Sequence, residues 1–301
     1  MSTGNGAGPR PLIRSILSVP GSSPRFLAKA EAVPADVIAF DLEDSVAPQE
    51  KAEARAAVVR AIDGFPKDGR LVYVRPNDLD TGLLEDDLAA IVRPGLDGIH
   101  LPKVHRPATL VQVDHYLTLL ERLSGLPSGS IRIMAWIESA EGVANVEAIC
   151  AASPRLVAVS VGSEDYAASL GVGRSADGAE LAFARGRVVN AAAAAGLVAI
   201  DGAETALGDP DRFWQAARAV RQLGYRGKFC IHPDQVQLVN DAFAPSGAER
   251  AWAEKVVEAF EAALEQGIGA ISVDGSMIDL PIYERARELL QWSARLRVGP
   301  S

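Results

Sequence analysis

The chain has 301 residues, 48% of them hydrophobic, and a formal net charge of −9 from 39 acidic and 30 basic side chains. This apolar content suffices for a sizeable core and excludes a disordered chain, while the acidic balance disfavours nucleic acid or an anionic membrane surface as a partner. Cys150 and Cys230 are too far apart to indicate a disulfide framework or a zinc site, so a reducing, cytoplasmic location is expected.

Residues 1–11 are small, polar and Gly-rich, which predicts a disordered lead-in without the apolar stretch of a signal peptide. From residue 12 to 245, short β-branched runs alternate with amphipathic segments. Strands are expected at residues 15–19, 37–41, 71–75, 98–102, 131–137, 156–161, 197–201 and 228–231. Helices are expected at residues 25–33, 49–62, 84–92, 109–123, 141–151, 181–195 and 211–223. Eight βα repeats predict a (β/α)₈ TIM barrel as the catalytic domain.

The remaining residues, 246–301, predict a C-terminal helical extension of the barrel. Helical patterns at residues 248–265 and 281–297 flank the short segment GAISVDGSMID. Such an arm either caps the bottom of the barrel or brings residues over the mouth of its own or a neighbouring barrel.

Polar residues follow the expected strands at the end where TIM barrels carry their chemistry. In chain order they are Asp41, Glu43, Asp44, Arg75, Lys103, Glu138, Glu164, Asp165, Asp201 and His232. Carboxylates that converge on one mouth repel one another unless a cation compensates them. Oxygen ligands without Cys or paired His select Mg²⁺, which Mn²⁺ could replace. We therefore predict Glu138 and Asp165 as metal ligands, the alternative for each being a helix cap or a salt bridge.

Arg75 follows the run LVYV, so its guanidinium is expected to emerge at the mouth. There it could stabilise a developing oxyanion, the alternative being a structural ion pair with Glu43 or Asp44. Lys103 could serve only to balance nearby acids. His232, which precedes a proline, is either a substrate contact or a structural histidine.

Four stretches carry a resemblance to a known family: RSILSVPGSSPRFLAKA at 14–30, DVIAFDLEDSVAPQEKAEAR at 36–55, IESAEGVANVEAICAASPRLVAVSVGSEDYAASLG at 137–171, and GKFCIHPDQV at 227–236. With DGSMIDLP near residue 280, the sequence resembles the citrate lyase β-subunit-like family, the acyl-CoA lyase branch of the HpcH/HpaI aldolase superfamily. The DLEDSVAP stretch with its following Lys and Ala-Arg is the most specific element. Trp136 is bulkier than the aliphatic residue expected there, and it either packs in the barrel or shrinks the substrate pocket.

The resemblance implies a Mg²⁺-dependent lyase or synthase that makes or breaks a bond between acetyl-CoA, or propionyl-CoA, and a 2-oxo acid such as glyoxylate, pyruvate or oxaloacetate; a coenzyme A thioester is thus the expected substrate. Arg75 would stabilise the thioester enolate, and Asp279 would move the proton at the acetyl carbon. In relatives the arm that carries this acid comes from a neighbouring subunit, so a homotrimer or higher homo-oligomer is expected.

The resemblance also implies binding residues. Glu43 and Asp44 would tune the water around the metal, which makes Asp44 a further catalytic candidate. Arg14 and Lys29 match positions that face the CoA phosphates. Ile231 and His232 are candidate substrate contacts.

Three alternatives stay open at this stage. A pyruvate-type aldolase of the same superfamily would act without CoA, but those relatives carry histidine where this chain has Asp44. Hydrolysis of the CoA product would make a malate synthase or thioesterase. A citrate lyase β chain would work only with partner subunits.

Overall fold

The computed structural model describes residues 12–298 except 67, 176, 206 and 207. Eight parallel strands close into a barrel in chain order, with β1 paired to both β2 and β8. The strands are β1 (Ser15–Pro20), β2 (Val37–Asp41), β3 (Leu71–Arg75), β4 (Gly98–Leu101), β5 (Arg132–Ile137), β6 (Leu156–Val161), β7 (Val198–Asp201) and β8 (Gly227–Cys230). The predicted TIM barrel is confirmed.

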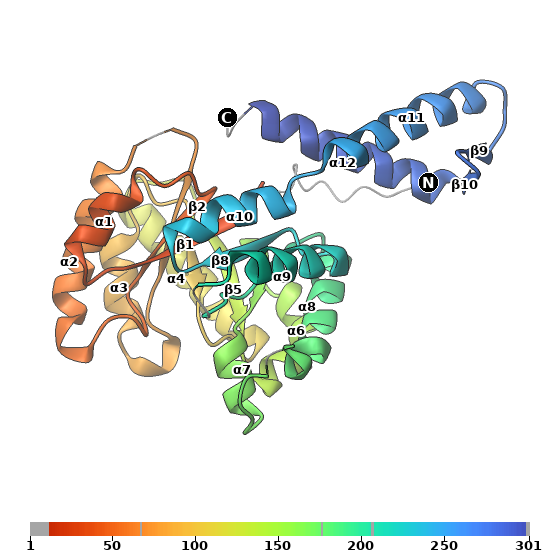
Figure 1. Ribbon diagram of the computed structural model, residues 1–301. Helices are drawn as coiled ribbons and strands as arrows, with labels where there is room; N and C mark the ends of the chain where they lie inside the picture. The colour runs from red at the N-terminus through yellow and green to blue at the C-terminus, as the bar shows by residue number, and fades with distance from the viewer. Residues whose placement is uncertain (1–11, 67, 176, 206–207, 299–301) are drawn as a thin grey trace. The chain divides into compact units, whose positions relative to one another are not determined.

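Helices cover the outside of the barrel strands (Figure 1). They are α1 (Pro24–Ala30), α2 (Lys51–Gly64), α3 (Leu84–Ile91), α4 (Pro107–Leu123), α5 (Ala140–Ala144), α6 (Val146–Cys150), α7 (Ser163–Ser169), α8 (Ala182–Ala195), α9 (Pro210–Leu223) and α10 (Pro233–Phe243). Three short 3₁₀ helices join them: η1 (Pro48–Glu50), η2 (Leu79–Thr81) and η3 (Ala179–Leu181).

The expected helix at 141–151 is two helices, α5 and α6, which is a correction to the prediction. The break lies at Asn145, which leaves helical geometry with φ −98° and ψ 4°. Its side-chain amide donates a hydrogen bond to the carbonyl of His105 at 2.9 Å. Asparagine side chains compete in this way with regular helix, so the interruption has a local cause. Helices α7 and α10 were not among the expected elements.

Alternation along β5 decides what faces the barrel lumen. Met134 and Trp136 belong to the lumen cluster, whereas Ala135 and Ile137 pack in the outer core against the helices. Because successive strand residues point to opposite faces, Glu138 is the next inward position, directly above Trp136 at the C-terminal mouth. The other residues of the lumen cluster are Ile13, Ile16, Val37, Ala39, Tyr73, Ala158, Val198, Ile200 and Phe229.

A second compact unit begins at Ala244, two residues before the predicted start of the arm. It contains α11 (Gly247–Leu264), β9 (Ile271–Val273), β10 (Ser276–Ile278) and α12 (Leu280–Val298). The antiparallel hairpin turns at Asp274 and Gly275, whose φ values of 51° and 77° fit a two-residue primed turn.

The lead-in predicted for residues 1–11 lies outside the described residues. None of the described helices is long and apolar enough to cross a membrane.

A buried charge network holds β6 to α4 at the N-terminal end of the barrel. Arg155, only 3% exposed, precedes β6 and pairs with Asp114 at 2.5 Å and with the fully buried Glu121 at 2.6 Å. Burial alone would raise the pKa of Glu121, but Arg155 and two backbone N–H groups lower it below its usual value. This network is therefore structural.

We predict that Arg155→Met lowers the free energy of unfolding at pH 7 by about 3 kcal/mol, because it leaves Glu121 as an unpaired buried charge. In the native protein the contribution of Glu121 is complete above its ordinary pKa near 4.5 and is lost as the pH falls through its lowered value. Urea unfolding should accordingly show the gap between the two proteins narrowing below pH 4.5. The control is Arg122→Met, an exposed residue of α4, the helix that carries Glu121. A gap that is absent at pH 7 would contradict this account.

Candidate functional site

A guanidinium shared by two carboxylates lies at the mouth, between the ends of β2 and β3. Asp41 and Arg75 are register partners, and Arg75 donates to both Asp41 oxygens, through Nε at 2.7 Å and Nη2 at 2.6 Å. Its Nη1 lies 2.9 Å from Oε2 of Glu43. Burial alone would raise the pKa of Asp41, but Arg75 holds it below the usual value, so this carboxylate stays ionised. The ion-pair alternative considered for Arg75 is thus present in the structure, with Asp41 as its principal partner.

Lys103 brings a second cation to the same carboxylates. Its ammonium lies 2.7 Å from Oε1 of Glu43, 3.5 Å from Asp78 and 3.8 Å from Asp44. Burial alone would lower the pKa of Lys103, but the pairing with Glu43 raises it above its usual value. Asp44 keeps 57% of its side chain exposed, so it lies at the open edge of the cluster.

Glu138 is held by backbone groups on two sides. The N–H of Lys103 donates to its Oε1 at 2.6 Å, and Lys103 has a left-handed φ of 51°, which is uncommon for a residue other than glycine. On the other side, a Cβ at Gly162 would lie 2.3 Å from Oε2 of Glu138. Only glycine therefore leaves the carboxylate room at this position.

The surroundings of Glu138 disfavour its negative charge unless a cation is bound. Its pKa is raised to about 8, mainly by burial and also by the nearby carboxylates of Asp165 and Glu43, while the Lys103 N–H and Arg75 oppose the shift. Asp165 itself is exposed in the first turn of α7, close enough to act on Glu138 electrostatically. A divalent cation would relieve this repulsion.

The donor set fits Mg²⁺ better than a softer metal. Within the described ranges, no three His, Cys, Asp or Glu side chains gather as a metal site. Mg²⁺ takes only one or two carboxylates and completes its coordination with water and substrate. Glu138 and Asp165 satisfy that requirement, and the cradle of Gly162 and Lys103 fixes one of them.

A layer of three rings closes the lumen below Glu138. His100 stacks on Trp136 and on Phe229 with ring centroids 4.6 and 4.5 Å apart, and the Trp136 and Phe229 rings are tilted against each other at 4.5 Å. Burial, and next the charge of Arg75, keep the pKa of His100 well below its usual value, so the ring is neutral. His100 Nε2, Trp136 Nε1 and Ser160 Oγ are buried without a hydrogen-bond partner among the described residues. Each buried polar group without a partner lowers the stability of the fold by about 1–3 kcal/mol, and an apolar side chain at the same position would not have this cost.

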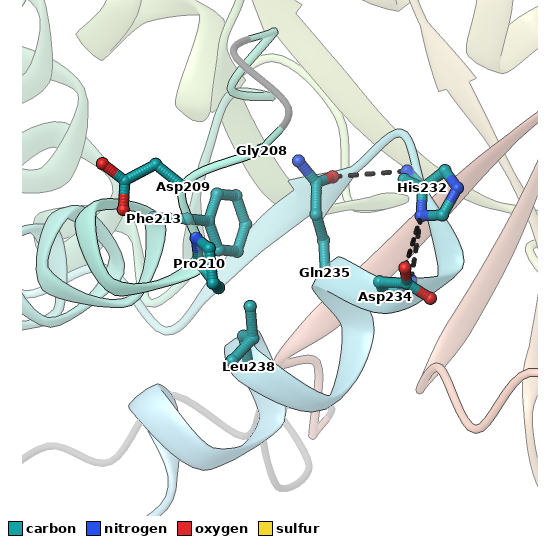
Figure 2. Close-up of a pocket in the computed structure, with 8 residues that line it drawn as sticks. All are labelled: Gly208, Asp209, Pro210, Phe213, His232, Asp234, Gln235 and Leu238. Carbon is teal, nitrogen blue, oxygen red and sulfur yellow. Dashed lines mark hydrogen bonds and ion pairs between the residues drawn. The ribbon is translucent and has the colours of Figure 1, made fainter.

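A separate cavity of about 260 Å³ opens beside the end of β8 (Figure 2). Phe213 and Pro210 of α9 face Leu238 and Gln235 of α10 across it, and His232 lies at the rim with half of its side chain exposed. The Gln235 amide oxygen accepts from the N–H of Ile231 at 2.8 Å and thereby fixes the end of β8. Asp209 and Asp234 are among the lining residues, and their negative charge disfavours a phosphate there.

The structure does not bring every predicted site residue to the mouth. Arg14 precedes β1 at the opposite end of the barrel, where it binds Asp36 through Nε at 3.0 Å and Nη2 at 2.7 Å. This position does not support the CoA contact that the resemblance implied. Lys29 is exposed in the last turn of α1 and not at a strand end. Asp279 lies in the C-terminal unit between β10 and α12, and its Oδ1 is buried without a partner among the described residues.

One acid at a strand end proves to be structural. Asp201 points outward from β7 and is paired with Arg185 at 2.8 Å and with the buried Lys228 at 2.5 Å. The outward direction follows from the strand geometry, since the structure places Ile200 inward and Asp201 is one position further.

Sequence reasoning also missed three contributors to the site. The bidentate role of Asp41 depends on the register of β2 against β3, which the sequence does not specify. His100 was detectable as a polar residue within the apolar run of β4. Gly162 was detectable as a glycine between a buried strand and an acidic helix start.

We predict that the backbone of Lys103 places Glu138, and that two variants lacking the ammonium will therefore differ. Asparagine tolerates the left-handed conformation, whereas a β-branched residue does not. Lys103→Val should bind Mn²⁺ at least about tenfold more weakly than Lys103→Asn, in line with a strain of about 1–3 kcal/mol. Titration calorimetry measures the affinities, and thermal unfolding checks that both variants are folded. Equal affinities would show that this backbone conformation does not position the carboxylate.

Comparison with known proteins places this chain in a family. Residues 14–233 match the HpcH/HpaI aldolase/citrate lyase family. The chain is 38% identical to the citrate lyase subunit β of Leuconostoc mesenteroides subsp. cremoris, over 93% of each chain. It is 35% identical to the L-malyl-CoA/β-methylmalyl-CoA lyase of Cereibacter sphaeroides, over 90% of this chain and 92% of the relative.

A solved structure gives the same result at the level of the fold. CitE from Mycobacterium tuberculosis, in complex with magnesium, acetoacetate and coenzyme A, is 30% identical with a TM-score of 0.77, and the alignment covers 94% of this chain and 99% of that one. The resemblance found in the sequence motifs is therefore confirmed, and the chain belongs to the HpcH/HpaI aldolase/citrate lyase family.

Proposed function

We propose that this protein is a Mg²⁺-dependent carbon–carbon lyase that cleaves or forms a 3-hydroxyacyl-CoA, with acetyl-CoA and a 2-oxo acid as the smaller partners. The observation that carries the proposal is the environment of Glu138. The Lys103 N–H fixes one of its carboxylate oxygens, and the nearby carboxylate of Asp165 repels its negative charge, so that a bound cation would stabilise both groups. The relatives named as malyl-CoA lyase and citrate lyase subunit β support this reaction class.

Each residue of the mouth has a distinct task in this chemistry. Glu138 and Asp165 hold Mg²⁺, which when bound supplies Lewis-acid polarisation of the oxo-acid carbonyl. Arg75, fixed by Asp41, presents positive charge toward the thioester oxygen, where the enolate charge develops. Asp44, exposed at the edge, orients water near the site. Ile231 and His232 at the end of β8 contact the acyl-CoA, and the exposed Lys29 is a candidate for its phosphates.

The proton at the acetyl carbon is assigned to Asp279, delivered by the arm of a neighbouring subunit. Within the C-terminal unit this acid is flanked by exposed apolar residues, Met277 at 66% and Leu280 at 52%. Leu264 and Ile268 add to the exposed apolar surface of the same unit. Such a surface is typical of a contact with another subunit, which supports a homotrimer or higher homo-oligomer. In the described part of the chain Oδ1 of Asp279 has no hydrogen-bond partner, so no contact there assigns it a structural role.

Two other activities remain as candidates. A citrate lyase β chain that needs partner subunits is favoured by the subunit names of the relatives, and activity of the isolated protein would exclude it. A CoA-independent aldolase is disfavoured by Asp44, where aldolase relatives carry histidine, and by the acidic arm.

The free thiols of Cys150 and Cys230, both buried, suit the proposed cytoplasmic location.

We predict that two substitutions separate metal binding from proton transfer. Glu138→Gln should weaken Mg²⁺ binding at least about tenfold, since a ligating charge is removed. Asp279→Asn should leave Mg²⁺ affinity unchanged but lower turnover of a hydroxyacyl-CoA at least about 100-fold, the contribution of a general acid or base. Calorimetry and a CoA-release assay measure the two quantities, with Glu254→Gln on exposed α11 as the control. Full turnover in Asp279→Asn would remove Asp279 from the mechanism.

We also predict that the two inactive variants complement each other. If the arm reaches a neighbouring barrel, an oligomer mixed from Glu138→Gln and Asp279→Asn subunits contains some sites with both native residues. Co-expression with two affinity tags isolates the mixed oligomers, whose turnover should be well above that of either variant alone. Mixed oligomers as inactive as the parents would place Asp279 in its own subunit's site or outside the reaction.

A further inference from the structure

The ring layer beneath Glu138 is the floor of the candidate site. We define the floor layer as His100 of β4, Trp136 of β5 and Phe229 of β8, whose mutual stacking distances of 4.5–4.6 Å leave the lumen filled from one side of the barrel to the other. A substrate that enters from the mouth therefore meets these rings before it can extend toward the barrel interior.

Trp136 is the member of this layer that faces the mouth. It keeps 8% of its surface exposed, whereas His100 keeps 1% and Phe229 2%. Glu138 is the next inward residue on the same strand, about 6.6 Å further along it. A small molecule held at Glu138 consequently lies over the indole, and any substituent directed down the barrel axis contacts Trp136.

The charges above the floor layer oppose a second carboxylate on the substrate. Arg75 is shared by Asp41 and Glu43, and Lys103 is shared by Glu43 and Asp78. Both cations that reach the cluster are thus already engaged by protein carboxylates. The substrate carboxylate that accompanies the reacting carbonyl has the metal as its partner, but a further one would face Asp41 and Glu43.

We propose that the floor layer makes Trp136 a specificity-determining residue, and that the oxo-acid substrate is a monocarboxylic 2-oxo acid whose carbonyl substituent is hydrogen or methyl. This inference rests on the proposed lyase function. Two kinds of 2-oxo acid should then be poor substrates. An acid with a longer uncharged substituent is too large for the space above Trp136, and an acid with a second carboxylate is repelled by Asp41 and Glu43.

The layer would open rather than collapse if Trp136 were made smaller. His100 Nε2 and Ser160 Oγ lie in the lumen without partners among the described residues, and Ser160 is the register neighbour of Trp136. A space lined by such polar atoms takes up water, which a substrate group can displace. Trp136→Leu should therefore create room for a longer substituent.

The first test uses the native holoenzyme with Mg²⁺, acetyl-CoA and four oxo acids: glyoxylate, pyruvate, 2-oxobutyrate and fresh oxaloacetate. The better of glyoxylate and pyruvate should exceed both 2-oxobutyrate and oxaloacetate at least about tenfold in kcat/KM, since one methylene in a tight pocket discriminates about 10–200-fold. Binding of each oxo acid with Mg²⁺ but without acetyl-CoA, measured by calorimetry, gives the same order independently of turnover.

The second test changes the floor layer. Trp136→Leu should shrink the pyruvate-to-2-oxobutyrate ratio at least about tenfold while oxaloacetate stays poor, because the engaged cations are unchanged. Trp214→Leu, a half-exposed tryptophan on the outer helix α9, should leave both ratios unchanged.

The possible results distinguish a failure of the substrate inference from a failure of the proposed lyase function. Turnover of 2-oxobutyrate or oxaloacetate by the native enzyme as fast as that of the better of glyoxylate and pyruvate would overturn the inference and leave the lyase standing, as would a folded Trp136→Leu enzyme with native ratios. Failure to bind or convert any of the four acids would overturn the lyase function and the inference together.

Discussion

The site depends on the pairing of Arg75 with Asp41 at adjacent ends of parallel strands. Parallel register brings side chains from successive strand ends to one mouth, and in this chain most of them are carboxylates. Without the shared guanidinium, and Lys103 beside it, Glu43 and Asp41 would be buried charges in mutual repulsion. With them, Asp41 stays ionised, and Glu138 is the carboxylate that we propose as a metal ligand.

One strand carries much of the chemistry. Because β5 alternates strictly, Trp136 fills the lumen, Ile137 packs outward, and Glu138 emerges at the mouth above the indole. The backbone of Lys103 and the missing side chain of Gly162 then fix Glu138 from two neighbouring strand ends. The proposed metal ligand and the residue proposed to limit substrate size therefore lie two apart in the sequence.

The sequence predicted the barrel because apolar runs and helix signals repeat strongly, and the strand ends named most of the acidic residues that meet there. It could not tell which acid is structural. Asp201 and Asp41 both end strands, yet Asp201 turns outward to Lys228 while Asp41 turns inward to Arg75. Motif matching likewise suggested CoA contact for Arg14, which lies at the opposite end with Asp36. Such differences depend on side-chain direction and tertiary pairing, which local patterns do not encode.

Product analysis tests the central claim most directly. The purified protein is incubated with Mg²⁺, acetyl-CoA and a 2-oxo acid, and separately with the corresponding hydroxyacyl-CoA, with and without EDTA, and the products are identified by mass spectrometry. The account predicts a hydroxyacyl-CoA or hydroxy acid in the forward assay and acetyl-CoA in the reverse, both abolished by EDTA. No product in either direction, or a product insensitive to EDTA, would contradict it.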